Sequence, residues 1–205
     1  IIIILLTVLV LFGCSSQPSK ESADKTSYKI GICNYVDDAS LNQINDNIQS
    51  QLKKIGEEND IEFIIIYSNC NADANLMNQI ISNFIAQEVD LMIGIATPVA
   101  LAMQAATEEN RIPVIFAAVS DPLSAGLVDS LETPGANISG TSDYLDTNSI
   151  MKLMSVLNPQ ISKVGLLYDL GQDSSTTAIK EAKQFLEENN IEFVERCGTN
   201  VSEIQ

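Results

Sequence analysis

Short apolar segments with strand character alternate with longer amphipathic segments along most of this 205-residue chain. The apolar segment Tyr28–Cys33, for example, precedes Leu41–Gly56, in which apolar residues recur at helical spacing. This alternation predicts an α/β fold with helices covering a parallel sheet, because parallel neighbours need a crossover connection. We expect Gly56 to end the first helix and Asp73 to cap the second. The expected strands are Tyr28–Cys33, Ile61–Tyr67, Val89–Ala96, Ile112–Val119 and Asn137–Gly140, and the expected helices are Leu41–Gly56, Ala74–Gln87 and Thr97–Glu109.

The alternation pauses at Thr133–Tyr144, which is rich in small residues, and then begins again. Only two further strands follow, and they bury too little apolar surface for an independent domain of ordinary size. We therefore expect a first doubly wound α/β lobe over residues 28–142 and the incomplete start of a second over residues 143–205. The chain also lacks an initiator methionine, so we expect it to be part of a longer reading frame. In the second lobe the expected helices are Asn148–Pro159 and Ser174–Asn190, and the expected strands are Lys163–Asp169 and Ile191–Arg196.

The N-terminal segment Ile1–Gly13 is apolar and uncharged, but it is shorter than the roughly 20 residues that a spanning helix needs. It is typical of the apolar core of a secretory signal peptide whose basic start is missing. The letters LFGC, which end at Cys14, match the bacterial lipobox, so residues 1–14 predict an incomplete signal peptide with a lipidated Cys14. The alternative is a signal peptide with a chance cysteine. Residues 15–27 are polar and unpatterned, which is typical of a flexible tether.

The charge balance restricts the partners of this chain. It has 27 acidic and 11 basic residues, a formal net charge of −16. Phosphate binding needs clustered Lys and Arg, so we expect no nucleic-acid partner. An acidic body is also repelled by anionic lipid. A lipid anchor at Cys14 would therefore have to hold an extracytoplasmic body at the membrane.

Histidine is absent from the chain, which excludes Ser-His-Asp and Cys-His catalysis and imidazole metal sites within these residues. Gly-rich phosphate loops of the Walker or GxGxxG kind are absent from the sequence as well. With Cys14 assigned to lipid, Cys33, Cys70 and Cys197 remain, without CxxC spacing. Cys33 and Cys70 could pair, or both could be small buried thiols. We expect neither an enzyme nor a resident metal or cofactor.

Three predicted strand ends carry candidate ligand-binding side chains, because ligands of open α/β sheets bind beyond the carboxyl ends of parallel strands. The loop after the first strand carries Tyr35 and Asp38. After the third strand, Thr97 is expected to be the N-cap and Pro98 the first helical residue, which leaves backbone N–H groups for a carboxylate or another anion. After the fourth strand, Asp121 could accept a ligand ammonium group. The alternatives are a plain helix start at Thr97 and an Asp-Pro turn at Asp121.

Four segments, in order and at matching spacing, resemble a known family over nearly all of Tyr28–Gln205. They are DLMIGIATPVALAMQAAT from Asp90, IPVIFAAVSDPLSAGLV from Ile112, PGANISGTSD from Pro134 and VGLLYDLGQDSS from Val164. These segments resemble the ABC-transporter solute-binding lipoproteins that include the bacterial tryptophan and phenylalanine binders. The resemblance implies the type 1 periplasmic-binding-protein fold, with two doubly wound parallel-sheet domains, of which the second is truncated here.

The resemblance also implies how the lobes would hold a ligand. They would close on one small, amino-acid-like molecule, with chain segments crossing between them near Thr141–Leu145. Thr97 and its neighbouring amides would bind the ligand carboxylate, and Asp121 its amino group.

In the second lobe the resemblance puts ligand-binding positions at Gln172, Ser174 and Ser175. The motif differs from the usual family pattern at three positions, since Leu170 replaces proline, Gln172 replaces glutamate and Ser174 replaces asparagine. Glutamine in place of glutamate removes one charge from this side of the cleft.

The partners follow from the same resemblance. A monomer would deliver its ligand to a membrane permease driven by an ATPase, without breaking a bond of the ligand. The alternative is a sensory lipoprotein of the same fold, whose closure is detected by a membrane receptor.

Overall fold

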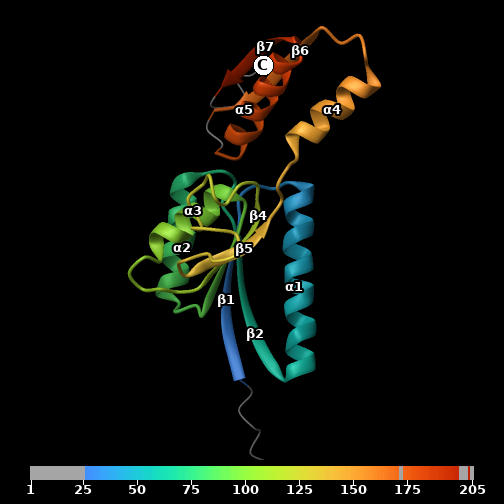
Figure 1. Cartoon of the computed structure of the whole chain (residues 1–205). Coiled ribbons are helices and arrows are strands. Elements are labelled where there is room, and N and C mark those ends of the chain that lie inside the picture. The colour runs from blue at the N-terminus through green and yellow to red at the C-terminus, as the bar shows by residue number, and fades with distance from the viewer. Residues whose placement is uncertain (1–25, 171–172, 199–202, 204–205) are drawn as a thin grey trace, which may run out of the picture.

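The computed structural model describes residues 26–170, 173–198 and 203. Ile1–Gly13, Cys14 and Gln172, for which the sequence predicts roles, lie outside these residues. The described chain forms two lobes, each built on a parallel sheet (Figure 1). The predicted α/β class is therefore confirmed.

The first lobe contains a five-stranded parallel sheet (Figure 1). Its strands are β1 (Thr26–Asn34), β2 (Ile61–Asn69), β3 (Leu91–Ile95), β4 (Val114–Val119) and β5 (Ile138–Ser142). Their order is β2-β1-β3-β4-β5, a doubly wound arrangement whose switch point lies between β1 and β3. Ile32 of β1 lies opposite Tyr67 of β2 and Ile93 of β3. This order brings the carboxyl ends of β1, β3 and β4 to one edge of the lobe.

Helices cover both faces of this sheet. They are α1 (Ala39–Asn59) on one face, and α2 (Ala74–Ala86) and α3 (Thr97–Ala106) on the other. Side chains of β1 alternate between the two cores, so Ile30 and Ile32 pack on the α1 side and Cys33 packs on the other side. Gly31 has no side chain because the ring of Phe84 from α2 occupies that space. A Cβ atom at Gly31 would lie 2.7 Å from the ring.

The end of α1 differs from the prediction that Gly56 stops the helix, which is wrong. The helix continues to Asn59 and is closed by Asp60, which is left-handed at φ 54 and whose N–H bonds the carbonyl of Gly56. Gly56 is buried inside the helix, where a Cβ atom would lie 2.6 Å from the carbonyl oxygen of Ile61. The glycine therefore permits the close return of the chain into β2.

Most other element boundaries lie close to their predicted positions. Asp73 caps α2 as predicted, accepting hydrogen bonds from the N–H groups of Asn75 and Leu76. β1 begins at Thr26 and so includes the last two residues of the predicted tether. β4 begins after Pro113, which cannot donate a ladder hydrogen bond.

The second lobe pairs two parallel strands with two helices. They are α4 (Thr147–Leu157), β6 (Lys163–Asp169), α5 (Asp173–Glu188) and β7 (Glu192–Gly198). Met151, Leu166 and Phe185 form part of its small core. Leu157 of α4 and Leu167 of β6 remain exposed. α4 ends two residues before Pro159, since a residue that precedes proline disfavours helical geometry.

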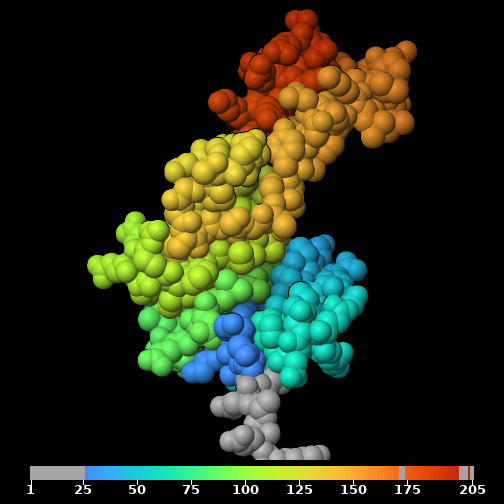
Figure 2. All heavy atoms as spheres, turned by 60° about the horizontal axis from the view of Figure 1, so that its bottom comes forward, coloured from blue at the N-terminus to red at the C-terminus, as the bar shows by residue number. Residues whose placement is uncertain are grey.

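The described chain passes between the lobes from β5 to α4 (Figure 1). In Figure 2 the orange and red atoms of the second lobe lie next to yellow atoms of the first. α3 and α5 contact each other across this boundary. Among the described residues, no helix has the length and apolar character needed to cross a membrane.

Candidate functional site

A cavity of about 240 Å³ lies between the lobes, at the carboxyl edge of the first sheet. Its walls come from the first turns of α3, the segment after β4 and the first turns of α5. This is the position where open α/β sheets bind ligands. The lining residues are Thr97, Leu101, Asp121, Ser124, Ala125, Ser174, Thr176 and Thr177.

Thr97 lines this cavity and carries a buried hydroxyl. Its side chain is 3% exposed, and its Oγ1 has no hydrogen-bond partner in the structure. Native proteins satisfy nearly all buried polar atoms, so the unpaired hydroxyl of this cavity-lining residue calls for an explanation.

The start of α3 differs by one residue from the prediction. Ala96, not Thr97, is the N-cap, and Pro98 is the second helical residue and does not line the cavity. The Ala96 N–H still bonds Ala117 in the sheet, and its φ of 83 turns the chain so that helical geometry begins at Thr97. A non-glycine residue with this φ is strained by on the order of 1–3 kcal/mol. No side chain caps α3, so its positive end lies next to the cavity without a protein cap.

Asp121 also lines the cavity, two residues after the end of β4 at Val119. One carboxylate oxygen accepts a hydrogen bond from the Ser124 N–H at 2.9 Å, and the other accepts from the Thr177 hydroxyl at 3.0 Å. Burial alone would raise the pKa of Asp121, but hydrogen bonds from Ser124, Thr177 and Leu123 outweigh it and lower the pKa below its ordinary value. Asp121 is therefore an anion at neutral pH. The bond to Ser124 also makes it the turn residue that the alternative interpretation expected.

The second lobe contributes Ser174 and Thr177, which are three residues apart on α5 and share one face. Ser175 lines a different cavity of about 570 Å³, beside Tyr168 and Leu170, and so is not brought to Thr97 and Asp121. Sequence analysis missed Thr177. Its helical spacing from Ser174 was the pattern that could have identified it.

Tyr35 and Asp38, predicted after β1, do not line the cavity either. The carboxylate of Asp38 caps α1 by accepting hydrogen bonds from the N–H groups of Ser40 and Leu41. Burial raises the pKa of Tyr35, and the nearby charges of Cys70 and of Asp169 in the second lobe raise it further. Asp169 of the second lobe therefore acts electrostatically on Tyr35, whereas Asp38 is the N-cap of α1.

The cysteines of the described chain are free thiols. Cys33 and Cys70 are buried in the core between the sheet and α2, and Cys197 is exposed. The mutual hydrogen bond of Cys33 and Cys70 lowers the pKa of Cys70 and raises that of Cys33. The described residues contain no group of three acidic or cysteine side chains placed to hold a metal ion.

Comparison with known proteins identifies the family. The model of the ABC transporter substrate binding protein family matches residues 29–205. This chain belongs to that family.

Relatives of this substrate-binding protein support the same assignment. It is 34% identical to a tyrosine-binding protein of Clostridioides difficile, over 97% of this chain and 59% of the relative. A Streptococcus pneumonia ABC domain in complex with L-Trp matches with a TM-score of 0.78 and 30% identity, over 87% of this chain and 60% of that one. A ligand-free, open structure of a Clostridium difficile substrate-binding protein with adhesive properties matches with a TM-score of 0.63 and 32% identity, over 86% and 59%.

The predicted family and its type 1 periplasmic-binding-protein fold are therefore confirmed. The chain spans about 59% of the length of the tyrosine-binding relative.

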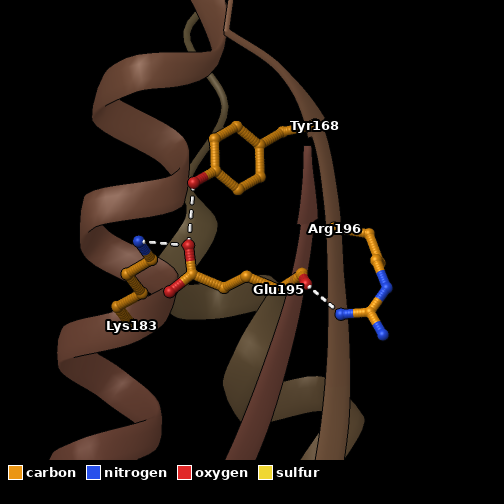
Figure 3. A network of polar contacts seen from close by, with 4 residues as sticks. All are labelled: Tyr168, Lys183, Glu195 and Arg196. Carbon is orange, nitrogen blue, oxygen red and sulfur yellow. Dashed lines mark hydrogen bonds and ion pairs between the residues drawn. The ribbon is translucent and has the colours of Figure 1, made fainter. Parts of the chain in front are cut away.

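A polar network connects the strands and the helix of the second lobe of this substrate-binding protein (Figure 3). Glu195 of β7 accepts a hydrogen bond from the Tyr168 hydroxyl at 2.7 Å and pairs with Lys183 of α5 through the same oxygen. The Lys183 ammonium also lies 5.6 Å from the centre of the Tyr168 ring. The hydrogen bond from Lys183, followed by that from Tyr168, lowers the pKa of Glu195. The network joins β6, β7 and α5, and so fixes the helix that carries Ser174 and Thr177.

Proposed function

We propose that this substrate-binding protein holds one free amino acid in the cavity between its lobes. The observation that carries the proposal is that Thr97, whose buried hydroxyl is unpaired, lines the same cavity as the ionised Asp121. A free amino acid carries a carboxylate and an ammonium group close together. The cavity supplies a donor for the first group and an acceptor for the second.

The carboxylate is assigned to Thr97 and the start of α3. The hydroxyl is a neutral donor, and the uncapped helix end adds backbone N–H groups and a partial positive charge. Hydrogen bonds to a charged group are stronger than those between neutral groups, which favours an ionised ligand here.

The ammonium group is assigned to Asp121. A carboxylate has about four acceptor positions. The Ser124 N–H and the Thr177 hydroxyl each use one, and Leu123 also donates to this carboxylate. An ammonium group would take a position that these donors leave open or replace one of them, while Leu101 and Ala125 supply apolar surface for other parts of the ligand.

Known ligands of the relatives support this ligand class. One relative is named a tyrosine-binding protein, and another structure holds L-Trp. Ser174 would complete the site from the second lobe, with Gln172 and Ser175 as further contacts that closure would have to bring in. Tyr35 is kept as a contact at the edge of the cleft because it lies in the field of Asp169.

Closure of the lobes is part of the proposal. The chain superposes better on the L-Trp complex than on the ligand-free, open relative, although the two identities are similar. This difference supports a hinge between the lobes. We place it at Thr141–Leu145, where the Asp143 N–H bonds Val119 of the first lobe and α4 of the second begins soon after.

Delivery to a permease and its ATPase is the proposed purpose of binding, with the protein acting as an extracytoplasmic monomer. The sequence LFGC supports a lipid anchor on Cys14. Through this anchor an acidic body with a net charge of −16 would stay at the membrane despite repulsion by anionic lipid.

Isothermal titration of the whole protein tests the ligand class. The panel contains L-tyrosine, L-tryptophan and L-phenylalanine, each beside its methyl ester and its deaminated acid. We expect binding of at least one free amino acid and weaker binding of both of its modified forms. A protein that binds none of the panel, or that binds ester and free acid equally, would contradict the proposal.

A further inference from the structure

Thr177 joins the two lobes through the side chain of Asp121. Its hydroxyl donates to the Asp121 carboxylate at 3.0 Å, although the two residues are 56 positions apart in the sequence. Thr177 belongs to α5 of the second lobe, and Asp121 follows β4 of the first. The bond is therefore made only when α5 lies against the first lobe.

The bond from Thr177 completes the positioning of Asp121. The Ser124 N–H holds one oxygen from within the first lobe, so this bond persists at any lobe position. The Thr177 hydroxyl holds the other oxygen and fixes the plane of the carboxylate. A hydroxyl also keeps two acceptor lone pairs. An ammonium group at Asp121 can therefore donate to Thr177 as well.

These contacts couple the relative position of the lobes to the ionisation of the Asp121 carboxyl. Hydrogen bonds from Thr177 favour the ionised carboxylate, which is the form that binds a cation. By reciprocity, an ionised Asp121 favours the lobe position in which Thr177 can reach it.

We propose that Thr177 is a positioning residue that couples closure of the lobes to ammonium recognition by Asp121. The inference rests on the proposed function, in which Asp121 receives the ammonium group of an amino acid. It adds a residue of the second lobe that acts through Asp121 and makes recognition of the ammonium depend on closure.

The test compares Thr177→Val, which keeps the shape and removes the hydroxyl, with Thr177→Ser, which keeps the hydroxyl. Thr133→Val is the matched control, because Thr133 is an exposed threonine of the first lobe outside the cavity. The first measurement is the pKa of the Asp121 carboxyl in the whole protein. It is determined by NMR titration without ligand and again with saturating L-tyrosine or L-tryptophan, because the Thr177 bond forms only when the lobes are in contact. Thr177→Val should raise this pKa relative to wild type, whereas Thr177→Ser and Thr133→Val should leave it low.

The second measurement is the affinity for L-tyrosine and L-tryptophan by calorimetry. A hydrogen bond to a charged group corresponds to roughly 10- to 150-fold in affinity. For Thr177→Val we expect a loss of affinity at the low end of this range, about tenfold, because the Thr177–Asp121 pair is partly exposed. Thr177→Ser should recover the wild-type affinity.

The two arms separate the inference from the proposed function. An Asp121 pKa that is unchanged in Thr177→Val, or an affinity that Thr177→Ser fails to recover, would overturn the role of Thr177. Absence of amino-acid binding by wild type would instead overturn the proposed ligand, and the titration would still decide whether Thr177 positions Asp121.

Discussion

Thr97 combines two locally unfavourable features that packing does not explain. Its hydroxyl is buried without a partner, which costs about 1–3 kcal/mol, and the preceding Ala96 has a strained positive φ. A valine at this position would fill the same volume without the unpaired group. Local conflicts of this kind are expected at functional sites, where the ligand supplies the missing partner.

Replacement of Thr97 by valine should therefore separate stability from binding. We expect the free energy of unfolding of Thr97→Val to stay the same or rise, because no hydrogen bond is lost. The affinity for a free amino acid should fall roughly tenfold or more, while the affinity for its methyl ester changes little. Urea denaturation and calorimetry measure the two quantities.

Thr107→Val is the control for this change. Thr107 is equally buried, but its hydroxyl donates to Met103 and accepts from Asn137. Its loss should reduce stability and leave affinity unchanged. If Thr97→Val instead loses stability as Thr107→Val does, and binds ester and free acid equally weakly, the assigned role of Thr97 is wrong.

Asp121 predicts a specific dependence of stability on pH. Its pKa in the folded protein lies below the ordinary value of 3.8. A carboxyl with a lowered folded pKa contributes stability above its unfolded pKa and loses that contribution as the pH falls through the folded pKa. The difference in unfolding free energy between wild type and Asp121→Asn should thus be constant from about pH 7 to 5 and shrink below pH 4. A difference that grows with acidification would show that Asp121 is not stabilised as an anion.

The ends of helices were predicted correctly where contacts between residues close in the sequence determine them. Asp73 caps α2 through N–H groups two and three residues away, so the sequence pattern was sufficient. The prediction that Gly56 ends α1 was wrong because the role of this glycine depends on the carbonyl of Ile61. α1 approaches that carbonyl only when the chain turns back into β2.

The candidate site shows the same division. Asp121 was predicted because it follows a predicted strand and Ser174 because of the family resemblance, and both line the cavity. The one-residue shift at Thr97 depends on backbone strain at Ala96. Helical spacing from Ser174 could have placed Thr177 on the same face, but its bond to Asp121 depends on the packing of the lobes, which no local pattern encodes.

The close contact between β1 and α2 predicts how a substitution in β1 changes the stability of the first lobe. Gly31→Ala would place a Cβ atom 2.7 Å from the ring of Phe84, so the helix or the ring must move. Overpacking of this kind typically costs about 1–3 kcal/mol. Gly165→Ala is the matched control, because a Cβ atom at this strand glycine of β6 meets nothing within 4 Å. Urea denaturation should show a clear loss of stability for Gly31→Ala and almost none for Gly165→Ala, and equal effects would contradict the close packing.

The residues proposed to bind the ligand are divided between the two lobes. Thr97 and Asp121 belong to the first, and Ser174 and Thr177 belong to the second. Neither pair can surround a small molecule alone. A ligand that contacts both lobes stabilises the closed arrangement only by the difference between its affinities for the closed and open states.

Ligand binding should therefore make the whole protein more compact. We expect the radius of gyration from small-angle scattering to decrease when the protein is saturated with the amino acid that calorimetry identifies. The segment Thr141–Leu145 should absorb the change in backbone angles. Asp121→Asn, measured at the same ligand concentration, should keep the larger radius because it lacks the proposed ammonium acceptor. Calorimetric binding without any change in radius would count against a hinge and indicate a pocket that is already closed before the ligand binds.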